Sequence, residues 1–280
     1  MSICAATVVF NEEARIETML RCARWCDEIV VVDKSSTDRT REIARKYTNL
    51  VFEVPYSDYS ASEIEKAFDC TTSEWICFLV ASDLIHPYLA RQIREMVDRS
   101  DFAYDVIHVP YRRYVLGLET KRSPWYSEVH PVVFRKKCVK IDYNSIHGPF
   151  LMDGVRHYKM PNSTKYCMYH LTHETVDGMM ERHIRYCRIE GQITSKDISL
   201  WIVFKGLLRS VFEVLFKKKS LLLGWDGIAL SLAYVMYSML SFLYIWEKKK
   251  SKASEEYLNI RNNVFNEWEV FNRNGNHASI

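Results

Sequence analysis

The amino-terminal part of the chain alternates between short apolar runs and amphipathic stretches, and each apolar run ends on polar residues. Residues 3–10 form an apolar run that stops at Asn11, and residues 29–32 form a second run that ends on Asp33. The second run contains only isoleucine and valine, without alternation, which is typical of a strand covered on both faces. Between the two runs, residues 16–25 carry apolar side chains at helical spacing. The pattern therefore predicts a strand, a helix and a strand, followed by a second helix.

Further apolar runs extend this α/β pattern. Residues 50–54 predict a third strand, and residues 75–80 predict a central strand that runs into Ala81, Ser82 and Asp83. Parallel strands joined by helices present their carboxyl ends as a ligand crevice. Because these strand ends carry acids and amides, we expect a polar ligand there. The predicted fold class is α/β, with a Rossmann-like, mostly parallel sheet flanked by helices.

After about residue 166 the pattern becomes helical. Residues 199–216 are mostly apolar with one narrow polar stripe and are followed by three lysines, a profile typical of a helix lying in a membrane interface. Residues 227–246 carry no charge and are long enough to span a bilayer. However, they carry a polar stripe, and lysines flank both ends, so the positive-inside rule gives no orientation. The pattern favours an in-plane or protein-packed hairpin over a membrane span or a soluble core helix.

Composition narrows the class of protein. A chain of 280 residues can bury a full core, and a net charge of +3 is too small to indicate nucleic acid as the main ligand. The eight cysteines show no CxxC spacing, and several fall inside apolar strand or helix patterns. We interpret them as reduced thiols of a cytosolic protein. The chain opens on a predicted strand, so no signal peptide is expected.

Two segments resemble a known family. TVVFNEE at residues 7–13 and DEIVVVD-x-x-STD-x-T at residues 27–40 resemble the amino-terminal signature of the family-two inverting glycosyltransferases. The resemblance is strong to about residue 100 and looser beyond, and it is closest to the bacterial branch that adds glucose to the lipopolysaccharide inner core. It implies a GT-A fold and transfer of a sugar, with inversion, from a nucleotide-sugar donor that is expected to be UDP-linked.

The resemblance also implies which residues hold the nucleotide. Phe10, Asn11, Glu12 and Asp33 would bind the base and ribose of the donor. A carboxylate is independently a natural acceptor for uracil N–H groups or ribose hydroxyls. Helix capping is the alternative role for Asp33, and it is the favoured interpretation for Asp38.

In the resembled family the central strand ends in an acid-x-acid motif that holds Mg²⁺ or Mn²⁺ against the donor diphosphate. Here Val80 and Ser82 stand at the two acid positions, and Asp83 is the remaining acid. Three interpretations stay open: Asp83 holds the metal with water and phosphate and is thereby catalytic, the donor binds without a metal, or the enzyme has lost activity. Ser82 is expected to lie at the nucleotide-sugar site.

Two later motifs fit the family pattern. Trp125 and Tyr126 match an aromatic–tyrosine pair in a loop and suit stacking on a sugar or acceptor ring. Arg135 ends the next strand in a Phe-Arg motif and could face phosphates. A solvated basic turn is the alternative interpretation for Arg135.

Inverting transfer needs a general base that takes the proton of the acceptor hydroxyl. His147 matches the histidine of a His-Glu pair in the resembled family, whereas Gly148 replaces the glutamate. His147 is therefore the predicted base, since the unperturbed pKa of histidine is near neutrality. Asp153 and Glu174 are other carboxylates within plausible reach, and a structural role for His147 is the alternative.

We expect a glycosyltransferase domain at residues 1–165, a helical membrane-associating region at 166–250 and a charged tail at 251–280. The expected acceptor is a glycolipid or a lipopolysaccharide-type surface glycan at the cytoplasmic face of the inner membrane. Residues 198–246 would hold the protein there as a peripheral or monotopic protein. One rival function is a catalytically silent nucleotide-sugar or glycolipid-binding scaffold. Another is nucleotidyl transfer, which would want a glycine-rich and basic loop after the first strand.

Overall fold

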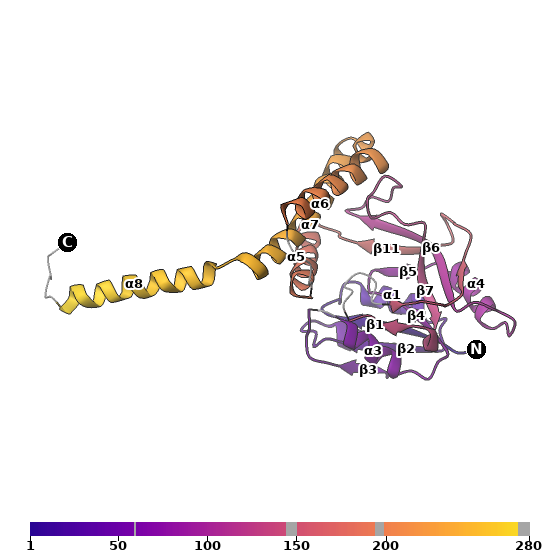
Figure 1. Cartoon of the computed structure of the whole chain (residues 1–280). Helices are drawn as coiled ribbons and strands as arrows, with labels where there is room; N and C mark the ends of the chain where they lie inside the picture. The colour runs from indigo at the N-terminus through magenta and orange to yellow at the C-terminus, as the bar shows by residue number, and fades with distance from the viewer. Residues whose placement is uncertain (59, 144–149, 194–198, 274–280) are drawn as a thin grey trace.

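The computed structural model in Figure 1 shows a curled α/β domain that carries a helical carboxyl-terminal region. The structure describes residues 1–58, 60–143, 150–193 and 199–273. The strand order of the main sheet is β3-β2-β1-β4-β7-β6-β11-β5, with β10 paired to β6. Its strands are β1 (Ile3–Val9), β2 (Glu28–Asp33), β3 (Val51–Glu53), β4 (Trp75–Phe78), β5 (Asp83–Ile85), β6 (Val106–Val115), β7 (Val129–Arg135), β10 (His157–Lys159) and β11 (Met168–Thr172). The short strands β8 (Lys140–Ile141) and β9 (Phe150–Leu151) pair with each other.

The first half of the sheet is parallel. β1 pairs with β2 and β4, and β2 pairs with β3, all in parallel. The connecting helices are α1 (Ile16–Ala23), α2 (Thr40–Ala44) and α3 (Ala61–Asp69), and α4 (Pro87–Val97) follows β5. Because the four strands run in one direction, their carboxyl ends meet at one edge. The predicted α/β class, with a mostly parallel sheet flanked by helices, is confirmed.

The core lies on both faces of this sheet. Along β2, Val31 belongs to the cluster that includes buried residues of α1 and α4, whereas Val30 and Val32 belong to the cluster that includes α3. On the neighbouring strand β4, Trp75 and Ile76 divide between the same two clusters and are fully buried. Helices on both faces therefore explain why residues 29–32 show no alternation of apolar and polar positions.

The chain turns sharply after β4. The Asp83 N–H donates to the carbonyl oxygen of Val80 at 2.8 Å, and Asp83 Oδ2 accepts from the Val80 N–H at 2.9 Å. This closed turn directs the chain into β5, which pairs antiparallel with β11. Asp83 is thus the first residue of β5, which lies at the opposite end of the strand order from β3. The sequence instead predicts Asp83 at the end of the central strand.

The described carboxyl-terminal helices are α5 (Val176–Ile193), α6 (Leu200–Phe212), α7 (Trp225–Lys250) and α8 (Ala253–Arg273). A π-helical segment (Glu213–Lys217) and a 3₁₀ turn (Ser220–Leu223) join α6 to α7. In Figure 1, α8 extends away from the rest of the molecule, and none of its residues is buried. Among the described residues, α7 is the one helix long and apolar enough to cross a membrane by length and composition.

The polar stripe of α7 faces its neighbours. The Ser210 hydroxyl of α6 donates to Ser238 Oγ at 2.8 Å, and the Ser241 hydroxyl donates to Glu190 Oε2 of α5 at 2.9 Å. Leu230 of α7 joins Val115 of β6 in a buried cluster. The helical region therefore packs onto the sheet domain through α7, with its polar groups turned inward.

Candidate functional site

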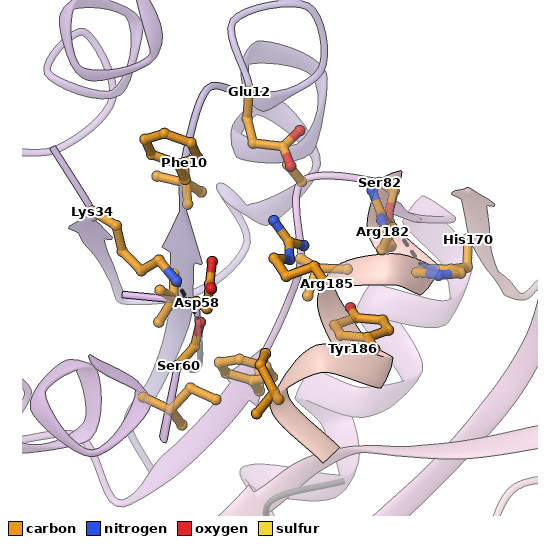
Figure 2. Close-up of a pocket in the computed structure, with 17 residues that line it drawn as sticks. Phe10, Glu12, Lys34, Asp58, Ser60, Ser82, His170, Arg182, Arg185 and Tyr186 are labelled. Carbon is orange, nitrogen blue, oxygen red and sulfur yellow. Dashed lines mark hydrogen bonds between the residues drawn. The ribbon is translucent and has the colours of Figure 1, made fainter. Parts of the chain in front are cut away.

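A cavity of about 310 Å³ opens at the edge where the parallel strands end. The ends of β1 and β4 and the loop after β2 form one wall, and α5 forms another (Figure 2). Its labelled polar and aromatic lining residues are Phe10, Glu12, Lys34, Asp58, Ser60, Ser82, His170, Arg182, Arg185 and Tyr186. We name it the donor cavity after the role proposed for it below. It occupies the edge at which the sequence predicts a polar ligand.

Asn11 ties the loop after β1 to the loop after β2. Its backbone adopts φ 52°, its N–H donates to Ser36 Oγ at 2.9 Å, and its Oδ1 accepts from the Thr37 N–H at 2.8 Å. The next N–H, of Glu12, donates to Thr40 Oγ1 at 2.6 Å. These bonds hold the ends of β1 and β2 side by side. Asn11 itself lines a neighbouring cavity of about 400 Å³ and shapes the donor cavity through its loop.

Replacing Asn11 with alanine should lower the free energy of unfolding by about 1–2 kcal/mol, because a hydrogen bond is lost and alanine is strained at positive φ. Asn11→Gly loses the same side-chain bond without the backbone strain, so we expect a smaller loss. Chemical denaturation of the three proteins measures both differences. Equal stability of the alanine variant and the parent would contradict the role given to Asn11.

Phe10 and Tyr56 form an aromatic pair beside the donor cavity. Their ring centroids lie 4.4 Å apart, and Lys34 Nζ lies 5.2 Å from the Tyr56 centroid. Lys34 also donates to Ser60 Oγ at 3.0 Å and to the Ser57 carbonyl, and burial lowers the pKa of its ammonium group. Flat aromatic faces suit stacking on a base or sugar ring, with one cation close by.

Asp33 lies fully buried at the end of β2. Its Oδ2 accepts from the Ser36 N–H at 3.1 Å and lies 3.7 Å from Nε of Arg41. Its Oδ1 is buried and has no hydrogen-bond partner. An unpaired buried carboxylate oxygen is costly. Asp33 therefore bonds within the loop after β2 through one oxygen and keeps the other as a free acceptor. It immediately precedes Lys34 and does not itself line the donor cavity.

Glu12 lines the donor cavity but is already partnered. Its Oε2 accepts from Arg15 Nε at 2.8 Å. Burial raises the pKa of the Glu12 carboxyl, against the lowering effect of Arg15 and Arg182. Glu12 therefore presents to the cavity an acid that is already paired with Arg15.

Ser82, Asp83 and His170 form a small cluster at the turn after β4. His170 Nδ1 lies 2.7 Å from Asp83 Oδ1 and 3.4 Å from Ser82 Oγ, and the second Asp83 oxygen accepts from Val80. Ser82 and His170 line the donor cavity, whereas Asp83 lies behind them. Ser82, which the sequence predicts at the nucleotide-sugar site, lies in the lining of this cavity. His170 was not predicted, because its role depends on the antiparallel pairing of β5 with β11.

The residues at this turn do not fit a divalent metal site. Val80 offers no ligand, and the two Asp83 oxygens are engaged by His170 and by a backbone N–H. In the part of the chain that the structure describes, no three His, Cys, Asp or Glu side chains form a group that could hold a metal ion. The expected role of Asp83 as the carboxylate ligand of Mg²⁺ or Mn²⁺ therefore disagrees with its position.

Helix α5 supplies cationic groups that the sequence analysis did not single out as site residues. Arg182 and Arg185 line the donor cavity together with Tyr186, and Arg182 Nη1 donates to Thr172 Oγ1 at 3.0 Å. Arg185 Nε is buried without a hydrogen-bond partner. The arginines fall on the polar face of an amphipathic helix, so periodicity alone cannot distinguish a cavity wall from solvent.

A second cavity, of about 410 Å³, shares Arg182, His170 and Tyr186 with the donor cavity. Trp125 lines this second cavity, and so do Tyr234 and Tyr237 of α7. We name it the acceptor cavity after the role proposed for it below. The predicted aromatic role of Trp125 is compatible with this place.

Tyr126, the neighbour of Trp125, points elsewhere. Its hydroxyl accepts from Arg112 Nη1 at 3.1 Å, and the Lys218 ammonium lies 5.6 Å from its ring centroid. The structure therefore brings Trp125, but not Tyr126, into the lining of a cavity at the site.

Arg135 lies at the opposite end of the strands from the donor cavity. β7 runs antiparallel to β4, and the last residue of β7 pairs with Trp75, the first residue of β4. The Arg135 guanidinium lies over the Trp75 ring at 4.5 Å and pairs with Glu74 and with Asp105. The expectation that Arg135 faces phosphates is wrong, because strand register places it far from the strand ends.

Three residues are candidates for the general base of the transfer step: His147, Glu174 and Asp153. His147 lies outside the described residues. Glu174 lines the cavity that also contains Asn11 and Glu12. Asp153 lies in the turn after β9 and is exposed, and it lines none of the cavities described above.

Comparison with known proteins identifies the class. Residues 4–160 match the model of the family described as glycosyl transferase family 2. The match covers more than half of the 280 residues. The chain belongs to glycosyl transferase family 2.

Several solved structures are similar to the whole or part of the chain. S. aureus TarS residues 1–349 in complex with UDP shares 15% identity over 89% of this chain and 92% of that chain, with a TM-score of 0.46. The same protein with UDP-GlcNAc shares 16% over 86% and 81%, with a TM-score of 0.49. Glucosyl-3-phosphoglycerate synthase from Mycobacterium tuberculosis, with Mn²⁺, UDP and glucosyl-3-phosphoglycerate, shares 16% over 49% and 57%, with a TM-score of 0.37. These likenesses are too low to transfer the role of any side chain.

Proposed function

We propose that this protein transfers a sugar from a UDP-sugar to a lipid-linked or lipopolysaccharide-type glycan, with inversion at the anomeric carbon. The observation that carries the proposal is the donor cavity of a family 2 domain, which is lined by Phe10, Lys34 and two arginines. Tyr56 packs on Phe10, and the buried, unpaired oxygen of Asp33 belongs to the residue just before Lys34. These groups match the base, ribose and diphosphate of a nucleotide-sugar in chemistry.

The donor is proposed to lie across the strand ends. The uracil stacks at Phe10 and Tyr56, and Asp33 accepts a hydrogen bond from the base or ribose once the loop that carries Lys34 adjusts around the ligand. This direction brings the diphosphate to the α5 side of the cavity, where Arg182 and Arg185 lie (Figure 2). The sugar then reaches the boundary that the donor and acceptor cavities share.

The acceptor is proposed to enter through the acceptor cavity. Its aromatic lining, from Trp125 and from Tyr234 and Tyr237 of α7, suits the ring of a glycan. Because α7 is also the most apolar long helix among the described residues, a lipid-borne acceptor could reach the cavity while its lipid part stays with the membrane.

Membrane attachment is proposed to use α6 and the segment that follows it. Trp201, Phe204, Leu208, Phe212 and Phe216 are all at least half exposed. Three lysines at 217–219 follow this apolar surface, and such a combination favours binding to anionic lipid headgroups. We define this exposed set as the α6 surface, and we place the protein at the cytoplasmic face of the inner membrane as a peripheral or monotopic protein.

The transfer step needs a base for the acceptor hydroxyl. His147 is retained as the proposed base through its resemblance to the family motif, with Glu174 as the candidate from the described residues. The acceptor oxygen attacks the anomeric carbon, the bond from that carbon to the β-phosphate oxygen breaks, and its electron pair leaves with UDP. The base takes the hydroxyl proton.

The test is transfer of label from a set of radiolabelled UDP-sugars to glycolipids of a bacterial membrane extract. We expect one donor to label the lipid-soluble fraction, and NMR of the product to show an inverted anomeric centre. Donor binding without any transfer would instead favour the silent scaffold, which the altered acid-x-acid positions make the second candidate. Absence of both binding and transfer would contradict the proposal.

A further inference from the structure

We propose that Arg182 and Arg185 of α5, with Lys34, neutralise the donor diphosphate in place of a divalent cation. The inference rests on the proposed function and concerns the same cavity. It makes this chain a metal-independent member of a class in which an acid-x-acid motif is usual at the end of the central strand.

The residues that follow β4 do not form a set of ligands for a divalent metal ion. The side chains at the two acid positions are those of Val80 and Ser82, and Asp83 has turned away to pair with His170. A magnesium-type ion prefers carboxylate oxygens in near-octahedral geometry. A single hydroxyl beside an imidazole does not provide such a set.

The cations of the donor cavity are available for an anion. Arg15, Arg41, Arg112 and Arg135 each pair with a carboxylate within the fold. By contrast, no carboxylate lies within ion-pair distance of Arg182 or Arg185 in the part of the chain that is described here. Arg182 bonds to the neutral Thr172 hydroxyl. Arg185 has a buried Nε without a hydrogen-bond partner, and the group that its guanidinium meets is the neutral Tyr56 hydroxyl.

Lys34 completes the arrangement from the opposite wall (Figure 2). Its ammonium bonds to neutral oxygens of Ser57 and Ser60. The cavity thus places three cations around its lining, against the two acids Glu12 and Asp58. The excess positive charge suits a ligand that carries a diphosphate.

Guanidinium groups can neutralise the charge of the donor diphosphate, as a divalent metal ion does. They stay protonated at any physiological pH and can donate two parallel hydrogen bonds to phosphate oxygens. As the bond from the anomeric carbon to the β-phosphate oxygen breaks, negative charge grows on UDP. Donors fixed at that place stabilise the developing charge without having to reorganise.

The chain offers a matched control on the same helix. Arg188 follows Arg185 by three residues, is exposed, and lines none of the cavities described above. Arg185→Ala and Arg188→Ala therefore remove the same charge from α5 at two positions that differ in whether they face the donor.

The experiment is calorimetric titration of the full chain with UDP and with uridine, in EDTA and in Mn²⁺. We expect the parent to bind UDP with the same affinity in both buffers. Arg185→Ala should lose roughly tenfold in UDP affinity, the effect of one charge-assisted hydrogen bond, with uridine affinity unchanged. Arg188→Ala should behave as the parent, and Arg185→Lys should lose less than Arg185→Ala, since the charge is kept.

Uridine binding also reports that each variant is folded. UDP affinity that falls in EDTA and returns with Mn²⁺ would overturn the inference while leaving the proposed function intact. Equal UDP affinity in Arg185→Ala and Arg188→Ala would also overturn it. Failure of the parent to bind UDP in either buffer would overturn the proposed function itself.

Discussion

Replacing Asp33 with alanine should weaken UDP binding by about 1–3 kcal/mol, or roughly 5- to 150-fold. The carboxylate is fully buried at the end of β2, and its Oδ1 has no hydrogen-bond partner. If a base N–H or a ribose hydroxyl donates to this oxygen, the alanine variant leaves that donor unpaired in a site that excludes water. Calorimetric titration with UDP measures the loss, and Asp33→Asn, which keeps one acceptor oxygen, should lose less.

Asp38 provides the control for this prediction. Both of its oxygens accept backbone N–H groups, Oδ1 from Thr40 at 2.9 Å and Oδ2 from Glu13 at 3.1 Å, so unlike Asp33 it has no buried oxygen left unpaired. Asp38→Ala should therefore lower the free energy of unfolding by about 1 kcal/mol, as expected for a lost cap, and leave UDP affinity unchanged. A folded Asp33→Ala variant that binds UDP as the parent does would remove Asp33 from the donor site.

Changing two aromatic residues of the α6 surface should release the protein from membranes. Phe212 and Phe216 are 58% and 64% exposed and stack on each other at 5.4 Å. Burying a phenylalanine in an apolar environment contributes about 1.5–3 kcal/mol, so the double variant Phe212→Ser/Phe216→Ser should lose at least about fiftyfold in partition. Sedimentation with vesicles that contain anionic lipid measures the change.

Tyr88 is the matched control for this surface. It is 58% exposed, like Phe212, but lies on α4, which is separate from α6 in Figure 1. Tyr88→Ser should bind vesicles as the parent does. Equal binding by the double variant and the parent would contradict the role of the α6 surface. Attachment that survives alkaline carbonate would instead indicate that α7 spans the bilayer.

The sequence predicts the parallel half of the fold because each signal for it comes from residues that are neighbours in the chain. The β-branched run before Asp33 and the helical spacing from residue 16 both depend on neighbours in sequence, and the structure confirms the α/β arrangement that they predict. The tie between the first two strand ends at Asn11 also lies within the segments that carry the family resemblance.

The parts that sequence could not predict depend on contacts between distant segments. Arg135 fails as a phosphate ligand because of the antiparallel register of β7 on β4. Asp83 is redirected by a turn that closes on Val80 and by pairing with His170, 87 positions along the chain. Arg182 and Arg185 occupy the polar face of α5, and only the packing of that helix over the strand ends turns them toward the donor cavity.

A crystal structure of the full chain with UDP tests the central claim most directly. We expect the uracil at Phe10 and Tyr56, with Asp33 accepting from the base or ribose, and the diphosphate within hydrogen-bond distance of Arg182 or Arg185. Clear density for UDP in another cavity, or for a diphosphate that points away from α5, would contradict the account.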